Sequence, residues 1–168
     1  MGVSRLLAFP NPVNEKAARV VAGVVFALSI LTLATGAYWM IAVLAYGFLA
    51  RVLTGPTLSP LGRIATSLVA PRLGAPKAVP GPPKRFAQGI GAALTVAGAV
   101  LALAGGPGWI VIVLLAMMIV ASGLESIFAI CVGCALFARL MGLGLIPASV
   151  CAECADLSLR GERAAAIG

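Results

Sequence analysis

The four cysteines of this chain fall into two pairs with the same internal spacing, Cys131 with Cys134 and Cys151 with Cys154, separated by sixteen residues. A repeated C-x2-C pair at this separation is typical of tetrahedral zinc, because each pair can hold one edge of the ligand tetrahedron. Reactive thiols are the alternative chemistry for such pairs. The cysteines are therefore the first candidates for a functional site.

Two functions follow from these pairs. In the first, Cys131, Cys134, Cys151 and Cys154 bind a structural zinc ion that orders the C-terminal tail, and the protein serves as a scaffold or subunit for a partner. In the second, the protein is a thiol oxidoreductase or sulfur carrier that works with a thioredoxin-like or sulfurtransferase protein, and Cys131 or Cys151 is the attacking thiolate. A third interpretation makes the cysteines small apolar fillers. No histidine occurs, which excludes histidine-dependent triads and metal motifs.

Glu125 is the only acidic residue within an apolar segment of membrane-spanning length. A carboxylate in lipid is costly unless it is paired or neutral, so it needs a partner or a function. We expect an ion pair with a connector arginine such as Arg63. A proton or substrate role, as in a transporter, is the alternative.

The composition places these residues in a membrane protein. Hydrophobic residues make up 61% of the chain, charged residues 10%, and the mean hydropathy is +1.10. A membrane helix needs about 20 apolar residues, and such a run must be helical because lipid offers its backbone no hydrogen bonds. We expect an all-α protein with helices at about residues 17–34, 38–53, 87–104 and 109–137. The links 35–37 and 105–108 are so short that the helices form two hairpins.

All twelve lysines and arginines lie outside the two short links, and the net charge is +7. Cationic residues stay on the cytoplasmic side of a membrane, so both termini are predicted to lie in the cytoplasm. There are too few aromatic residues beside the cations to stack bases, which argues against nucleic-acid binding. A permanent disulfide is not expected in this reducing compartment.

The predicted hairpins are separated by a cytoplasmic connector, residues 51–86, with six basic residues, no acidic residue and seven prolines. Within it, Ser59 can cap a short helix that starts at Pro60. In the segment before the first long helix, which we call the leader, Asn14 can cap that helix. The domain boundaries expected from this pattern are 1–141 for the membrane domain and 142–168 for a cytoplasmic tail that carries the second cysteine pair.

Several short motifs resemble a bacterial family of membrane proteins known as domain of unknown function family 4395. The resemblance lies in Asn14-Glu15-Lys16, in the run from Ser59 to Arg63, in Gly74-Ala75-Pro76, and in Glu125-Ser126 followed by Ile130 to Cys134. It covers nearly the whole chain, and members similar to this one end in a second cysteine pair, which matches Cys151 and Cys154. The resemblance implies the membrane topology and a place in the bacterial inner membrane. It draws attention to Glu125 and the cysteines, but it implies no activity.

Overall fold

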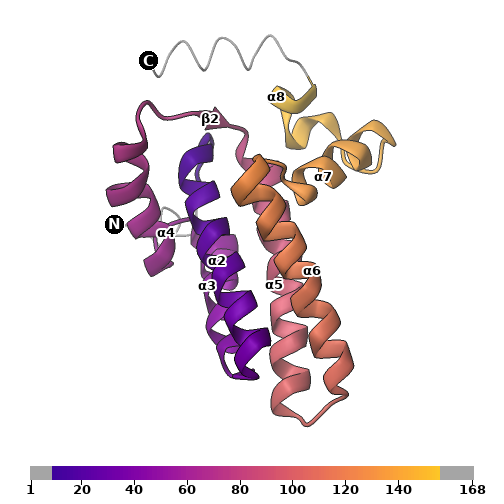
Figure 1. Cartoon of the computed structure of the whole chain (residues 1–168). Coiled ribbons are helices and arrows are strands. Elements are labelled where there is room, and N and C mark those ends of the chain that lie inside the picture. Colours follow the sequence, from indigo (N-terminus) through magenta and orange to yellow (C-terminus); the bar gives the residue numbers. More distant parts are fainter. Residues whose placement is uncertain (1–8, 156–168) are drawn as a thin grey trace.

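Four long helices lie side by side and form the body of the molecule (Figure 1). The structure, a computed structural model, describes residues 9–155, and most of this part of the chain is helical. The long helices are α2 (Glu15–Thr35), α3 (Met40–Thr54), α5 (Gly81–Leu103) and α6 (Gly108–Phe128). The all-helical fold class is therefore confirmed.

The helices pack across the two halves of the chain. α2 lies mainly against α6, and α3 lies mainly against α5. The core that results contains Val25, Leu44, Phe48 and Met118, which are almost fully buried. The close approach of α3 and α5 depends on Gly91, because a Cβ at that position would collide with the ring of Phe48. Small residues thus serve packing within the chain, as they commonly do between apolar helices.

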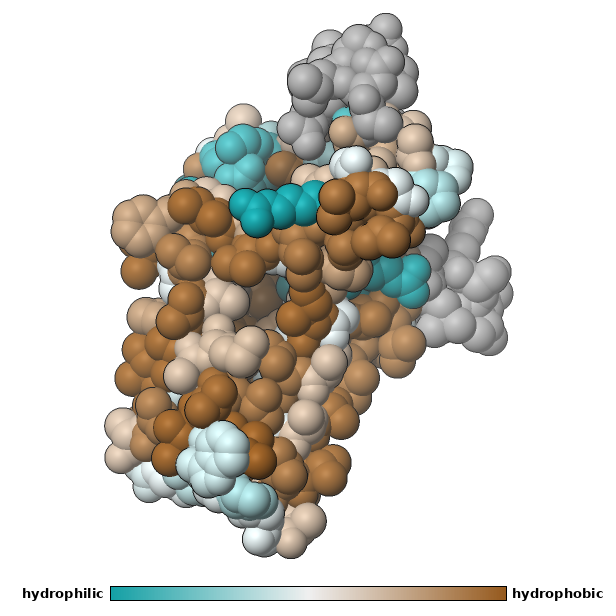
Figure 2. All heavy atoms as spheres, turned by 90° about the vertical axis from the view of Figure 1, so that its right-hand side faces the viewer, coloured by the Kyte–Doolittle hydropathy of each residue, from teal (hydrophilic) through white to brown (hydrophobic). Residues whose placement is uncertain are grey.

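Three of the four long helices are long and apolar enough to cross a membrane. These are α2, α5 and α6, while α3 has 15 residues and is shorter than the other three. Figure 2 shows apolar side chains over most of the side on which α6 lies, with hydrophilic residues gathered toward one end. These features indicate a membrane protein, and the four-span topology stays a prediction.

Side-chain caps begin two of the helices at the predicted positions. Asn14 precedes α2, and its Oδ1 accepts a hydrogen bond of 3.0 Å from the backbone N–H of Lys16. Ser59 precedes α4 (Pro60–Ile64), and its Oγ accepts one of 3.1 Å from the N–H of Gly62. Both caps satisfy backbone donors that the first turn of a helix leaves without partners.

The connector is held to the leader by a short antiparallel pairing. After α4 the chain forms a π-helix, η1 (Ala65–Val69), a 3₁₀-helix, η2 (Ala70–Leu73), and the strand β2 (Ala78–Val79), which pairs with β1 (Val13–Asn14). The third long helix begins at Gly81. The apolar pattern of the sequence predicted a start near residue 87. The first turn of this helix contains Pro82 and Pro83, which is allowed because the N–H groups of the first turn have no helical acceptor.

The fourth long helix is shorter than predicted. It ends at Phe128 and does not continue to residue 137, because Ala129 adopts a left-handed conformation with φ 60°. A separate helix, α7 (Val132–Gly142), follows and packs against α5. The chain then continues through η3 (Ala148–Val150) to α8 (Ala152–Ala155). The break and α7 lie at the end of the molecule opposite the two short links (Figure 1).

Candidate thiol site

The first cysteine pair begins a helix. Cys131 is the N-cap residue of α7, and its Sγ accepts a hydrogen bond of 3.3 Å from the backbone N–H of Cys134. A helix N-terminus carries partial positive charge and stabilises an anion placed there. A cysteine in this position is therefore suited to exist as a thiolate, which is the nucleophilic form.

The neighbours of this pair divide the two thiols into a more acidic and a less acidic one. A hydrogen bond from the Cys134 thiol lowers the pKa of Cys131, and the ammonium of Lys84 lowers it further, against the opposing effects of burial and Glu125. The same hydrogen bond, together with burial, raises the pKa of Cys134. Cys131 is thus the more acidic thiol of this pair, and the raised pKa of Cys134 favours its protonated form.

Glu125 forms its ion pair with Lys84 and not with Arg63. The Lys84 Nζ lies 2.5 Å from the Glu125 Oε1, and both side chains are largely buried. Lys84 lies in the first turn of α5 and Glu125 in the last turn of α6, so the pair joins two helix ends. Arg63 is an exposed residue of α4. The expectation that Glu125 has a basic partner was right, but the partner named from the sequence was wrong.

Sequence reasoning missed the role of Lys84. It was counted only as one of several connector cations before the third long helix. The run of prolines from Pro80 to Pro83 could have signalled it, because proline is favoured in the first turn of a helix. A helix that begins at Gly81 brings Lys84 to the level of Glu125 and the cysteines, whereas one that begins near residue 87 leaves it in the connector.

One cysteine of the second pair lines the same cavity as the first pair. Cys151 and Cys154 form a disulfide, while Cys131 and Cys134 are free thiols. Cys131, Cys134 and Cys154 line one cavity of about 290 Å³, together with Lys84 and others, and we name it the thiol cavity. Cys151 is 5% exposed and is not among the lining residues. Cys154 is therefore the half of the disulfide that shares a cavity with the free thiols.

The four predicted zinc ligands are in two different states, one pair as free thiols and the other as a disulfide. Within residues 9–155, no three cysteine or acidic side chains lie together in a way that could hold a metal ion. Two of the four predicted ligands are bonded to each other. A thiolate is the form of cysteine that binds zinc, so the Cys151–Cys154 disulfide would have to be reduced first. Zinc binding at these four residues stays a prediction.

Aromatic packing and a small residue hold α7 in place. The rings of Phe86 on α5 and Phe137 on α7 meet edge to face, with their centroids 5.6 Å apart. Gly133, between the two free cysteines, lies so close to α5 that a Cβ there would be 2.5 Å from the Cβ of Ala87. On the other side of the break, the guanidinium of Arg19 donates to the carbonyl oxygens of Ser126 and Ile127 at the end of α6. The chain on both sides of Cys131 is therefore anchored.

Fold and site together define a class of protein: a helical protein with helices apolar enough to cross a membrane and a C-x2-C thiol pair at the start of a short helix. The chain belongs to the family described as domain of unknown function DUF4395, which it matches over residues 13–142. The match includes Glu125 and the first cysteine pair and ends before the second pair. No curated protein and no solved structure matches the chain.

Proposed function

We propose that this protein is a membrane thiol–disulfide oxidoreductase in which the Cys131–Cys134 pair exchanges electrons with the Cys151–Cys154 pair. One observation carries the proposal: two free cysteines and one cysteine of a disulfide line the same cavity. Exchange needs an attacking thiolate, a disulfide within reach and a second thiol to complete the reaction. Cys131, Cys154 and Cys134 supply these three functions in turn.

The exchange proceeds in two steps. The Cys131 thiolate attacks the Sγ of Cys154, so that a Cys131–Cys154 bond forms, the Cys151–Cys154 bond breaks and Cys151 leaves as a thiolate. Cys134 passes its proton to Cys151 and attacks the Sγ of Cys131, which releases Cys154 as a thiolate. The products are a Cys131–Cys134 disulfide and a reduced second pair. Two electrons have moved between the pairs, and the reaction is reversible.

The membrane placement is part of the same proposal. Four helices cross the bacterial inner membrane, and both cysteine pairs lie at its cytoplasmic face because the lysines and arginines avoid the two short links. Disulfides in the cytoplasm are usually transient and catalytic. A Cys151–Cys154 disulfide on that side therefore favours exchange with a thioredoxin-like partner over a permanent structural bond.

Cross-linking of single cysteine combinations tests the exchange. The variant Cys134→Ser/Cys151→Ser keeps only Cys131 and Cys154, and treatment of the purified full-length protein with diamide is expected to join them within the chain. The matched control Cys131→Ser/Cys154→Ser keeps Cys134 and Cys151 and is expected to link much less, because Cys151 does not line the thiol cavity. Peptide mapping identifies the bond. Equal linking in both variants, or none in the first, contradicts the mechanism.

Metal analysis of the same preparation separates this function from the zinc scaffold. About one zinc per chain, lost when any of the four cysteines is replaced by serine, would support the scaffold. Metal-free protein whose two pairs are reversibly oxidised would support exchange. A sulfur carrier gives a third result, a persulfide on Cys131 after incubation with a sulfane-sulfur donor, which mass spectrometry detects.

A further inference from the structure

A second cluster of polar groups, apart from the cysteines, surrounds the side chain of Arg51. This residue lies in the last turn of α3 and is 6% exposed. Its Nε donates to the Oε1 of Gln88 at 2.8 Å, its Nη1 donates to the Oγ of Ser59 at 3.4 Å, and its Cζ lies 4.5 Å from the ring centroid of Phe48. The Nη2 is buried and has no hydrogen-bond partner. All the contacts of this cation are thus with neutral groups.

No acidic side chain neutralises Arg51 in the part of the chain that the structure describes. Of the acidic residues on the long helices, Glu15 pairs with Lys77 and Glu125 pairs with Lys84. Glu125 interacts with Arg51 electrostatically, but it makes no ion pair with Arg51, and its Oε1 lies 2.5 Å from the Nζ of Lys84. The group formed by Arg51, Lys84 and Glu125 therefore carries one positive charge in excess. Buried charges in proteins are normally paired, and cations near a bilayer are normally paired too.

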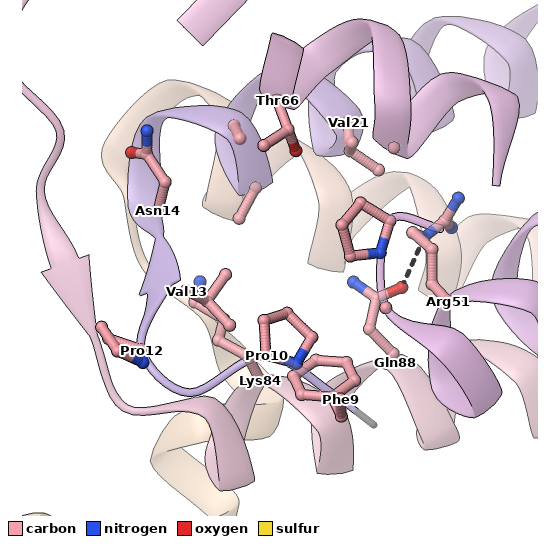
Figure 3. A pocket seen from close by; sticks show the side chains of 15 residues that line it. Phe9, Pro10, Pro12, Val13, Asn14, Val21, Arg51, Thr66, Lys84 and Gln88 are labelled. Carbon is pink, nitrogen blue, oxygen red and sulfur yellow. Dashed lines mark hydrogen bonds between the residues drawn. The ribbon is translucent and has the colours of Figure 1, made fainter. Parts of the chain in front are cut away.

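Arg51 borders a cavity of about 260 Å³ between α2, α3, α5, the connector and the leader, which we name the cation cavity (Figure 3). Lys84 and Gln88 line it as well, and Thr66 lies across from them. Among residues 9–155, no acidic side chain lines this cavity, and the other lining groups are mainly apolar. The space is many times what one water molecule needs. A cavity with excess positive charge and an unused guanidinium donor is suited to an anion.

We propose that the cation cavity binds a phosphate oxyanion through Arg51. A guanidinium presents its N–H groups as a planar fork that matches phosphate geometry, and the buried Nη2 of Arg51 has no hydrogen-bond partner within the protein. The oxyanion would supply the negative charge that the Arg51, Lys84 and Glu125 group lacks. It belongs either to free phosphate or to the phosphodiester of an anionic lipid headgroup. This site does not depend on thiol exchange and would exist if the cysteines had another function.

The test uses the full-length protein in nanodiscs made of phosphatidylcholine alone or with added phosphatidylglycerol. Inorganic phosphate is titrated into the first sample, and the midpoint of thermal unfolding is measured in both. If the ligand is free phosphate, the midpoint rises with phosphate concentration. If the ligand is a lipid, the midpoint rises only with phosphatidylglycerol, and native mass spectrometry finds that lipid retained on the protein.

Three variants decide whether Arg51 is responsible. Arg51→Gln is expected to lose the rise in midpoint, and Arg51→Lys to keep part of it because the charge remains without the fork. Arg63→Gln removes an exposed arginine of α4 and is expected to respond as the wild type does. A response of Arg51→Gln equal to that of the wild type overturns the proposal. So does a wild-type protein that responds to neither ligand, a result that holds even if Arg51→Gln does not fold.

Discussion

Lys84 and Glu125 meet at 2.5 Å and join the first turn of α5 to the last turn of α6, beside the free thiol of Cys131. The two members of the pair act on that thiol in opposite directions, since the cation favours the thiolate and the carboxylate disfavours it. The ion pair therefore does more than hold two helix ends together. It sets the electrostatic surroundings of the proposed nucleophile.

Replacement of either partner is expected to move the titration of Cys131 in a predictable direction. Lys84→Met removes a charge that lowers the pKa of Cys131, so the pH at which Cys131 becomes half alkylated in a fixed time should rise. Glu125→Gln removes a charge that raises this pKa, so that pH should fall. The measurement is the rate of iodoacetamide modification against pH, in a background with Cys134, Cys151 and Cys154 replaced by serine. A shift of the same sign in both variants contradicts the electrostatic account.

The hydrogen bond from Cys134 gives a second prediction for the same thiol. It is the largest influence that lowers the pKa of Cys131, so Cys134→Ala should raise that pKa. Cys134→Ser keeps a hydroxyl that can donate to the thiolate and should have a smaller effect. Both variants are compared with the protein that keeps Cys134, with the second pair replaced by serine in all three. If alanine and serine act alike, the side-chain hydrogen bond is not the cause.

The packing of α7 on α5 predicts that two glycine substitutions in α7 have very different effects on the free energy of unfolding. Gly133→Ala places a Cβ 2.5 Å from the Cβ of Ala87, so α7 must move, at a cost of about 1–3 kcal/mol. Gly142→Ala meets nothing within 4 Å and should be neutral or stabilise by about 0.5–1 kcal/mol. Thermal unfolding measures both. Cross-linking of Cys131 to Cys154 should also weaken with Gly133→Ala alone, and unchanged linking would show that α7 does not position the thiol.

The proposed topology predicts which positions a membrane-impermeant maleimide can reach in intact cells. In a chain whose four cysteines are replaced by serine, Thr35→Cys and Gly108→Cys place single thiols at exposed positions of the two short links. Both should be labelled from outside. A single Cys154 should be labelled only after the membrane is permeabilised. Labelling of Cys154 in intact cells would place the thiol cavity on the other side and would remove the argument for a cytoplasmic partner.

The features that the sequence determined by itself are those controlled by neighbouring residues. Long apolar runs must form helices where no water can satisfy the backbone, and three of the resulting helices are long and apolar enough to span a membrane. The caps at Asn14 and Ser59 were predictable for the same local reason, since a side-chain oxygen bonds to a backbone N–H two or three residues later. Family membership also followed from short motifs that the sequence contains.

The tertiary structure alone decided where the fourth long helix ends. No glycine or proline marks Ala129, and the apolar pattern continues beyond it, so local rules extend the helix to residue 137. The left-handed conformation of Ala129 costs about 1–2 kcal/mol. It accompanies contacts between α7 and α5, such as those of Phe137 with Phe86 and of Gly133 with Ala87, which lie more than 40 residues apart in the chain. Sequence patterns do not show how the cost of this backbone conformation compares with the contacts between remote segments.

The composition of the two polar sites was likewise decided by which helix ends meet in space. Lys84 and not Arg63 reaches Glu125, because α5 begins six residues earlier than its apolar run indicates. Cysteine spacing identified the four thiols, but only the fold brings Cys154 to the cavity of Cys131 and leaves Cys151 away from it. Local propensity determines helices and caps, whereas ion pairs and shared cavities depend on distances between segments that are remote in sequence.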